Sequence, residues 1–182
     1  MEIPAYQRVE YFHRFENVRR RAQLWRVWCR LLGKPQTLLP FAPIYSCLKQ
    51  RVGHRLGVQE IPLRQIVGSF DKVHRFDRSF RPLSDDLRTR WVNMKMLQMT
   101  GGWEPIDVHW IGNLYFVEDG HHRVSVARDA GLDVIEANVV AYPSPYEFDV
   151  DEDLETILRR LETPKSGKHL ERGEQLPAGS CS

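Results

Sequence analysis

The segment at residues 115–131, YFVEDGHHRVSVARDAG, most constrains the fold, because it predicts a strand that is followed after one short turn by a helix. An apolar run stops at Glu118 and Asp119, Gly120 follows, and a helix-like stretch then ends at Gly131. A turn of this kind leaves the N–H groups of the first helical turn unpaired and directs the positive end of the helix dipole outward. The sequence therefore predicts an α/β fold in which this turn is available to an anion.

The segments around this unit extend the pattern to strand, helix, hairpin, helix and strand. Ser84 is placed to cap a helix on which Leu87, Trp91, Met94 and Leu97 form one face. We expect a strand at 63–66, that helix from 84 to a stop at 101–102, a hairpin that turns at Gly112 and Asn113, a helix at 121–130 and a strand at 134–142. This order predicts a small mixed sheet with flanking helices, an α/β or α+β arrangement.

The basic charge lies at the front of the chain. Residues 1–58 hold eleven Lys and Arg against three Asp and Glu, a net charge of +8, whereas the remainder holds fifteen against twenty-one, a net charge of −6. A segment of this charge suits a nucleic-acid backbone, an anionic membrane surface or the acidic remainder of the same chain.

A long basic helix is predicted from Tyr6 to Leu32, with Gly33 and Pro35 as its stop. Spacings of three and four residues join one apolar stripe: Tyr11, Phe15, Val18, Ala22, Trp25, Cys29 and Leu32. The stripe is widened in this prediction by Leu24, Val27, Trp28 and Leu31, and it must be buried against the chain's own domain, a second copy in a homodimer or another partner. Packing on the chain's own domain or a second copy is favoured over a nucleic-acid helix, because a charge run alone is common on solvated faces.

The chain divides into four parts by composition. Residues 1–58 form a basic helical arm and linker, 59–142 a compact domain, 143–163 an acidic helix, and 164–182 a polar tail with too little apolar content to pack. No apolar segment reaches the length of about 18 residues that a membrane span needs, and the N-terminus resembles no secretory signal. The three cysteines, Cys29, Cys47 and Cys181, show no metal-ligand spacing, so we expect reduced thiols and a cytoplasmic location.

Two interpretations of the DGHHR turn follow from the residues alone. In the first, Gly120 lets the backbone approach a phosphate, His121 and His122 open the helix, and Arg123 adds a charged fork; Asp119 is then a cap, a Mg²⁺ ligand or a base. In the second, Asp119 only caps the helix, one histidine packs and Arg123 pairs with a nearby acid. The spacing does not separate the two interpretations.

The same segment resembles the signature of the ParB/sulfiredoxin superfamily, in which a strand runs into a G-x-[HR]-R turn and a helix. The resemblance covers about residues 59–142, with EIPLRQIVGS similar to the opening strand, and the whole arrangement is most similar to small bacterial ParB-like proteins. It implies that Gly120, His121, His122 and Arg123 bind nucleotide phosphates. The implied cofactor is ATP, ADP or CTP with Mg²⁺.

The departures from named members narrow the activity that the resemblance implies. His121 stands where sulfiredoxin has its catalytic cysteine, so sulfinic acid reduction is not expected. The helix-turn-helix domain, the dimerisation domain and the NP-x-QPR box of partition proteins have no counterpart in the sequence. Near the place of that box, Ser69, Arg75 and Arg81 are candidates for additional phosphate contacts.

Two function classes stay open from the sequence. The first is a nucleotide-binding regulatory or DNA-associated module whose basic arm meets nucleic acid or a protein partner. The second is a small enzyme, either a phosphotransferase like the free-serine kinases, which share the letters DGHHR, or a nuclease that uses Asp119 and a divalent metal. The enzyme needs a second carboxylate near the turn, for which Asp71, Asp77 and Glu118 are the candidates.

Overall fold

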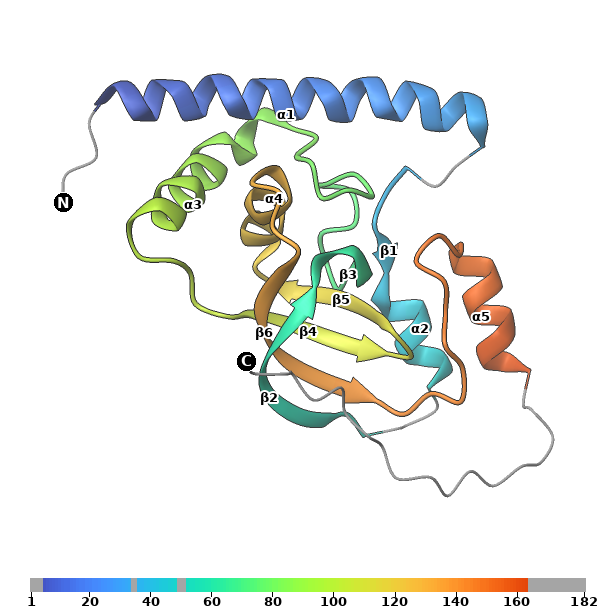
Figure 1. Cartoon of the computed structure of the whole chain (residues 1–182). Helices are drawn as coiled ribbons and strands as arrows, with labels where there is room; N and C mark the ends of the chain where they lie inside the picture. The colour runs from blue at the N-terminus through green and yellow to red at the C-terminus, as the bar shows by residue number, and fades with distance from the viewer. Residues whose placement is uncertain (1–4, 34–35, 49–51, 164–182) are drawn as a thin grey trace.

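Six strands form one mixed sheet in the computed structural model, which describes residues 5–33, 36–48 and 52–163 (Figure 1). The strands are β1 (Leu39–Pro40), β2 (His54–Pro62), β3 (Ile66–Ser69), β4 (Ile106–Ile111), β5 (Leu114–Asp119) and β6 (Val134–Tyr142). Their order across the sheet is β1-β3-β5-β4-β6-β2. The pairs β1/β3, β3/β5 and β4/β6 are parallel, and β4/β5 and β2/β6 are antiparallel. The predicted mixed sheet is confirmed.

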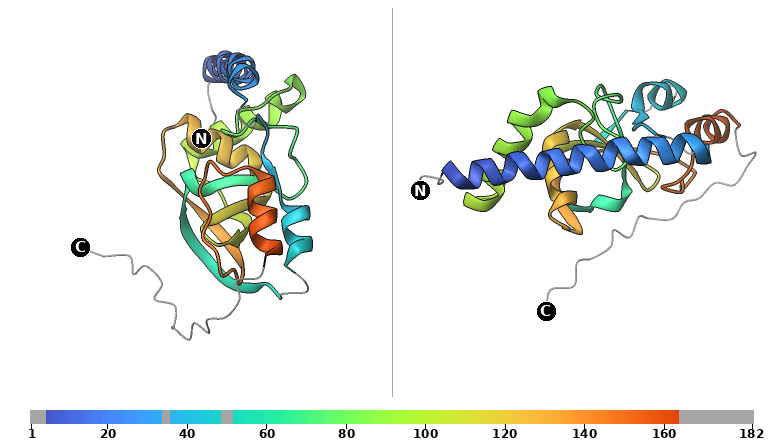
Figure 2. Two further views of the ribbon diagram at one scale, coloured as in Figure 1. Left: turned by 90° about the vertical axis from the view of Figure 1, so that its right-hand side faces the viewer. Right: turned by 90° about the horizontal axis from the view of Figure 1, so that it is seen from above.

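Helices cover both faces of this sheet. The α-helices are α1 (Ala5–Leu32), α2 (Phe41–Cys47), α3 (Arg88–Thr100), α4 (His121–Asp129) and α5 (Leu154–Glu162), and the 3₁₀ turns are η1 (Leu63–Gln65) and η2 (Asp85–Leu87). Figure 1 and Figure 2 show α1 lying across α3 and α4, while α2 and α5 lie side by side elsewhere on the sheet. Along β5 the side chains alternate between two apolar clusters, with Tyr115 and Val117 in one and Leu114 and Phe116 in the other. This period of two is what a sheet covered on both faces requires.

The long N-terminal helix is confirmed, and part of its predicted apolar face is correct. Phe15, Val18, Ala22 and Cys29 are buried. The ring of Phe15 meets that of Trp91 in α3 edge to face, with centroids 5.8 Å apart. α1 is therefore packed on its own domain.

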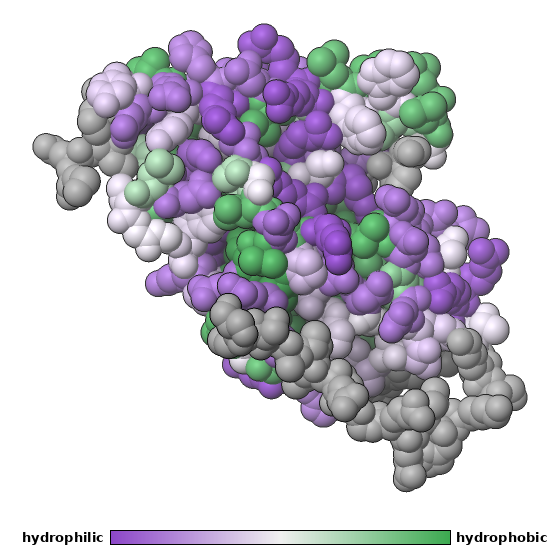
Figure 3. Space-filling view, in the orientation of Figure 1, coloured by the Kyte–Doolittle hydropathy of each residue, from purple (hydrophilic) through white to green (hydrophobic). Residues whose placement is uncertain are grey.

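The predicted widening of this stripe is wrong. Leu24, Val27, Trp28 and Leu31 are 60–75% exposed, and Leu32 at the helix end is also exposed. At about 100° of rotation per residue, the four side chains fall on the side of the helix opposite Ala22 and Cys29. Figure 3 shows hydrophobic surface where the C-terminal end of α1 projects beyond the body.

The segment predicted as arm and linker, residues 1–58, also contains part of the sheet. It holds β1, α2 and the first half of β2. Phe41 and Ile44 of α2 are fully buried. β2 itself was not predicted, because its first five residues are exposed and therefore carry no apolar alternation. Removal of residues 1–58 would thus take away more than the basic helix.

The predictions for the middle of the chain are confirmed in outline. The hairpin of β4 and β5 turns at Gly112, whose φ is +63°, and α4 stops before Gly131, whose φ is +73°. Ser84 does not cap with its side chain, because its hydroxyl donates to the Asp86 carboxylate and the chain enters α3 through η2. Residues 63–65, predicted as strand, form η1.

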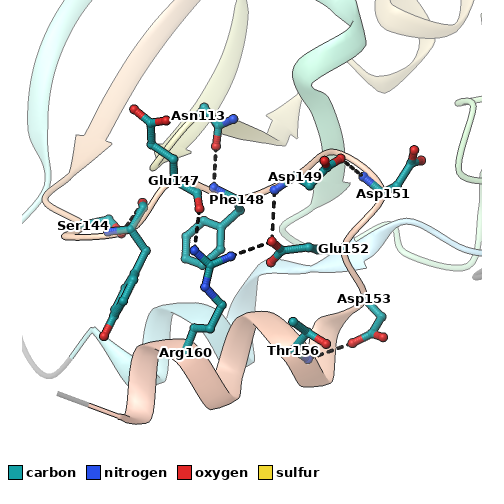
Figure 4. A network of polar contacts seen from close by, with 11 residues as sticks. Asn113, Ser144, Glu147, Phe148, Asp149, Asp151, Glu152, Asp153, Thr156 and Arg160 are labelled. Carbon is teal, nitrogen blue, oxygen red and sulfur yellow. Dashed lines mark hydrogen bonds and ion pairs between the residues drawn. The ribbon is translucent and has the colours of Figure 1, made fainter. Parts of the chain in front are cut away.

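The acidic C-terminal helix is tied to the hairpin by Arg160 (Figure 4). Its guanidinium donates to Glu152 Oε1 at 2.5 Å and to the Glu147 carbonyl at 2.8 Å, and it lies over the ring of Phe148. The Phe148 N–H in turn donates to Asn113 Oδ1 at 2.7 Å, in the turn between β4 and β5. The predicted polar tail, residues 164–182, lies outside the described residues.

Candidate phosphate-binding site

The turn between β5 and α4 requires glycine at its centre. Gly120 has φ +104° and ψ +16°, a left-handed conformation that side chains disfavour. A Cβ there would lie 2.4 Å from Ile106 Cγ2. The Asp119 side chain does not cap α4, and the first hydrogen bond of the helix runs from the Val124 N–H to the Gly120 carbonyl. The N–H groups of the first helical turn therefore have no partner within the helix.

His121 is almost fully enclosed beside this turn. Its Nε2 lies 2.7 Å from Ser69 Oγ at the end of β3, and Ser69 Oγ also accepts the Lys72 N–H at 2.8 Å. The ring stacks against Phe76, with centroids 5.8 Å apart. Its Nδ1 is buried and has no hydrogen-bond partner among the described residues. Burial and the nearby Lys72 charge lower the pKa of His121 to about 3, so the ring is neutral at physiological pH.

His122 faces a group of cations. Burial lowers its pKa to about 4, and the charges of Arg90, Lys72 and Arg75 add to this effect in that order. Asp119 alone opposes them. Arg90 belongs to α3, and Lys72 and Arg75 belong to the loop after β3, so separate elements place positive charge near the first turn of α4.

Two of these cations lack a carboxylate partner. Arg75 pairs with Asp86, whereas the side chains of Lys72 and Arg90 make no ion pair with any residue that the structure describes. Cations without carboxylate partners, together with unpaired backbone N–H groups, favour the approach of an anion.

Arg123 is held by the protein itself. Its Nη1 donates to the Glu104 carbonyl at 2.7 Å and the Pro105 carbonyl at 2.8 Å, and its Nη2 donates to the Asp119 carboxylate. The side chain is 14% exposed, whereas that of Asp119 is 63% exposed. These contacts fix the start of β4 to the turn. They occupy three of the five guanidinium N–H groups and leave Nε–H and one Nη2–H.

The three carboxylates predicted as possible second catalytic groups beside Asp119 lie in three different surroundings. Asp77 is fully buried and faces Arg81, with Oδ2 at 2.9 Å from Nε. Glu118 lies 3.1 Å from His109 Nε2, and Asp71 is exposed on the loop after β3. Across residues 5–33, 36–48 and 52–163, no group of three or more His, Cys, Asp and Glu side chains is arranged to hold a metal ion.

The structure thus brings Ser69 and Arg75 to the DGHHR turn, but it does not bring Arg81 there. Sequence reasoning missed Lys72 and Arg90. The signal for Lys72 was its position three residues after Ser69, on the same loop. Arg90 carried no signal, because only the packing of α3 brings it to α4.

Comparisons with known proteins add little to this geometry. No protein-family model matches the sequence, and no curated protein matches it. Among solved structures, the chain is similar to the sulfiredoxin of Arabidopsis thaliana, with 20% identity over 45% of this chain and 82% of that one and a TM-score of 0.35. Among the described residues, the helices are all too short or too polar to cross a bilayer.

Proposed function

We propose that the chain is a nucleotide-binding module whose phosphate site is the first turn of α4, and that it serves a regulatory or DNA-associated role. The observation that supports the proposal is the uncapped first turn of α4, which Ser69 joins to the loop that carries Lys72. Lys72 and Arg90, which make no ion pair with the described residues, and Arg75, which pairs with Asp86, add positive charge near this turn. Phosphate oxygens would satisfy both the cations and the backbone N–H groups.

The histidines suit this role as neutral groups. A neutral His121 packs against Phe76 and shapes the turn without adding charge. The buried Nδ1 atoms of His121 and His122 are without partners among the described residues, and each could donate to or accept from a bound nucleotide according to its tautomer. Arg123 would then orient the turn through its carbonyl contacts and reach phosphate with its remaining N–H groups.

The DNA-associated part of the proposal depends on α1. Arg20, Arg26 and Arg30 are exposed on this helix and make no ion pair within the described residues. Exposed arginines of this kind can neutralise backbone phosphates. Nucleotide at α4 would change how α1 meets its partner.

Titration calorimetry of the full chain with ATP, ADP, CTP and GTP, each with and without Mg²⁺, tests the nucleotide site. The best nucleotide should bind Lys72→Gln and Arg123→Ala about 10- to 150-fold more weakly than wild type, which corresponds to about 1.5–3 kcal/mol for a charge-assisted hydrogen bond. Arg123→Lys should recover part of the loss, because it keeps the charge without the planar fork.

Arg64→Gln is the matched control. Because Arg64 is exposed on η1, this variant should bind the nucleotide as tightly as wild type. Lys72→Gln is the more decisive variant, because Lys72 makes no ion pair in the described structure whose loss would unsettle the fold. Equal affinity in wild type, Lys72→Gln and Arg123→Ala would refute the site. Phosphate release from ATP that Asp119→Asn abolishes would point to the phosphotransferase or nuclease alternative.

A further inference from the structure

A pocket lies beneath α1, between this helix, the 76–81 loop and α4. It has a volume of about 560 Å³, within the range of small-molecule sites. Three elements contribute its polar and aromatic lining: Arg21 and Trp25 from α1, Ser79 and Arg81 from the 76–81 loop, and Ser125 and Arg128 from α4. Ser125 lies four residues after His121 on α4, about 6 Å further along the helix.

The pocket is rich in positive charge. Among the described residues, Arg128 donates to backbone carbonyls, including those of Leu63 at 2.7 Å and Ile66 at 2.8 Å. Arg81 faces the buried carboxylate of Asp77 through Nε. Burial lowers the pKa of Arg128 to about 10, and repulsion from Arg78 and Arg81 contributes while Asp77 opposes it. Arg81 and Arg128 thus share the charge of one buried carboxylate, that of Asp77.

The acid that lines the pocket, Asp129, is already paired. Asp129 Oδ2 lies 2.6 Å from Arg14 Nε and 3.8 Å from Lys95 Nζ. Arg21, at the mouth, is exposed and makes no ion pair with the described residues. Of the arginines in the lining, Arg81 pairs with Asp77, whereas Arg21 and Arg128 make no ion pair with a carboxylate of the described residues.

Two neutral side chains of the lining add a hydrogen-bond donor and an aromatic surface. Ser125 is buried, and its Oγ accepts the Trp91 Nε1–H at 3.0 Å, so its own O–H remains as a donor. Trp25 is 39% exposed and has the Arg81 guanidinium 5.7 Å from its ring centroid. An indole that is half open beside a cationic site offers a surface to an apolar or planar group.

We propose that this pocket binds a phosphate monoester, with its phosphate among Arg21, Arg81 and Arg128 and its organic group against Trp25. Guanidinium forks suit phosphate oxygens, and the hydroxyl of Ser125 adds a neutral donor. Because the lining comes from α1 on one side and from α4 and the 76–81 loop on the other, the ligand would bridge α1 to the body of the protein. This site is distinct from the nucleotide site proposed above and does not depend on it.

Phenyl phosphate is the probe, titrated by calorimetry into the full chain. Wild type should bind it, Arg21→Gln should bind it at least tenfold more weakly, and Arg20→Gln should bind it as wild type. Arg20 is the matched control because it is also an exposed arginine of α1 but lies outside the pocket lining. Trp25→Ala should weaken the binding of phenyl phosphate. Inorganic phosphate should bind wild type more weakly than phenyl phosphate does, because it lacks the ring.

Hydrogen exchange gives a second readout. Phenyl phosphate should slow exchange of the backbone amides of residues 18–25 in wild type and in Arg20→Gln, but not in Arg21→Gln. No binding to wild type, or equal binding to all three proteins, would overturn the proposal. The proposal would also be overturned if Lys72→Gln no longer bound phenyl phosphate while Arg21→Gln still bound it. The probe would then occupy the turn of α4. Failure of ATP to bind at that turn leaves this test unaffected.

Discussion

Ser69 Oγ and His121 Nε2 lie 2.7 Å apart, and this contact joins the end of β3 to the first turn of α4. The same hydroxyl accepts the Lys72 N–H, so one buried side chain orders both the turn and the loop that carries the cations. A buried polar group held in this way costs free energy when it loses its partner. Burial of the ring favours the neutral imidazole of His121.

Acid should destabilise the protein through its two enclosed histidines. The pKa of His121 falls to about 3 and that of His122 to about 4 on folding, chiefly because burial disfavours the charged form. The unfolded chain binds these protons below about pH 6.5, so the stability that the neutral rings provide is present above that pH and is lost as pH falls toward 4. Between pH 7 and pH 5, each histidine should lower the free energy of unfolding by about 2 kcal/mol.

Urea unfolding at several pH values measures this loss. His121→Gln should flatten the dependence of the unfolding free energy on pH, whereas His13→Gln, which removes an exposed histidine of α1, should follow wild type. Superimposable curves for wild type and His121→Gln would contradict the assignment.

Packing of α1 on the body can be tested at two positions of the same helix. Phe15→Ala should lower the free energy of unfolding by about 3–5 kcal/mol, because it leaves a cavity beside Trp91. Leu24→Ala should change it by less than about 0.5 kcal/mol, since Leu24 faces solvent. Denaturant midpoints of the two variants give the comparison, and a similar effect of both would mean that the buried face is assigned wrongly.

Arg160 should anchor the C-terminal helix. Arg160→Ala leaves the partly buried Glu152 carboxylate without its ion pair and the Glu147 carbonyl without its donor, so we expect a loss of about 1–3 kcal/mol. Arg159→Ala, at an exposed neighbouring position, is the control and should be close to neutral. Thermal unfolding of both variants checks the prediction, which fails if the two melt together.

Nucleic-acid binding, if α1 provides it, should depend on salt through its exposed arginines. The triple variant of Arg20, Arg26 and Arg30 to Gln should bind duplex DNA more weakly, and its slope of log affinity against log salt should be less steep by up to about 2.7 for three phosphate contacts. Substitution is preferable to removal of residues 1–58, because that segment contains β1 and α2. An unchanged slope would exclude these arginines from binding.

Local chemistry made much of this fold predictable. Gly112 and Gly131 have the positive φ that their turn and helix stop require, and the hairpin and α4 were therefore visible in the sequence. Likewise, the spacing of Phe15, Val18, Ala22 and Cys29 gave the buried face of α1. Predictions failed where tertiary contacts decide. β2 is an edge strand with an exposed first half, and Leu24 has the same local spacing as a buried residue but no neighbour to cover it.

The candidate site shows the same limit. The DGHHR letters located the turn, and Ser69, a candidate phosphate contact in the sequence, lies beside it in the structure. They could not reveal that Arg123 is already engaged by the carbonyls of Glu104 and Pro105, because those contacts join segments 18 and 19 residues apart. Nor could they reveal Arg90, which reaches the site only through the packing of α3 on α4.

The 76–81 loop borders both candidate sites. Phe76 and Phe80 contact the ring of His121, whereas Ser79 and Arg81 line the pocket beneath α1. The Asp77 carboxylate closes the loop by accepting the N–H groups of Ser79 and Arg81, and Phe80 is held at φ +58°, a conformation that costs a bulky residue free energy. If a ligand at one site shifts this loop, thermodynamic reciprocity requires that a ligand at the other alter the affinity of the first by the same factor.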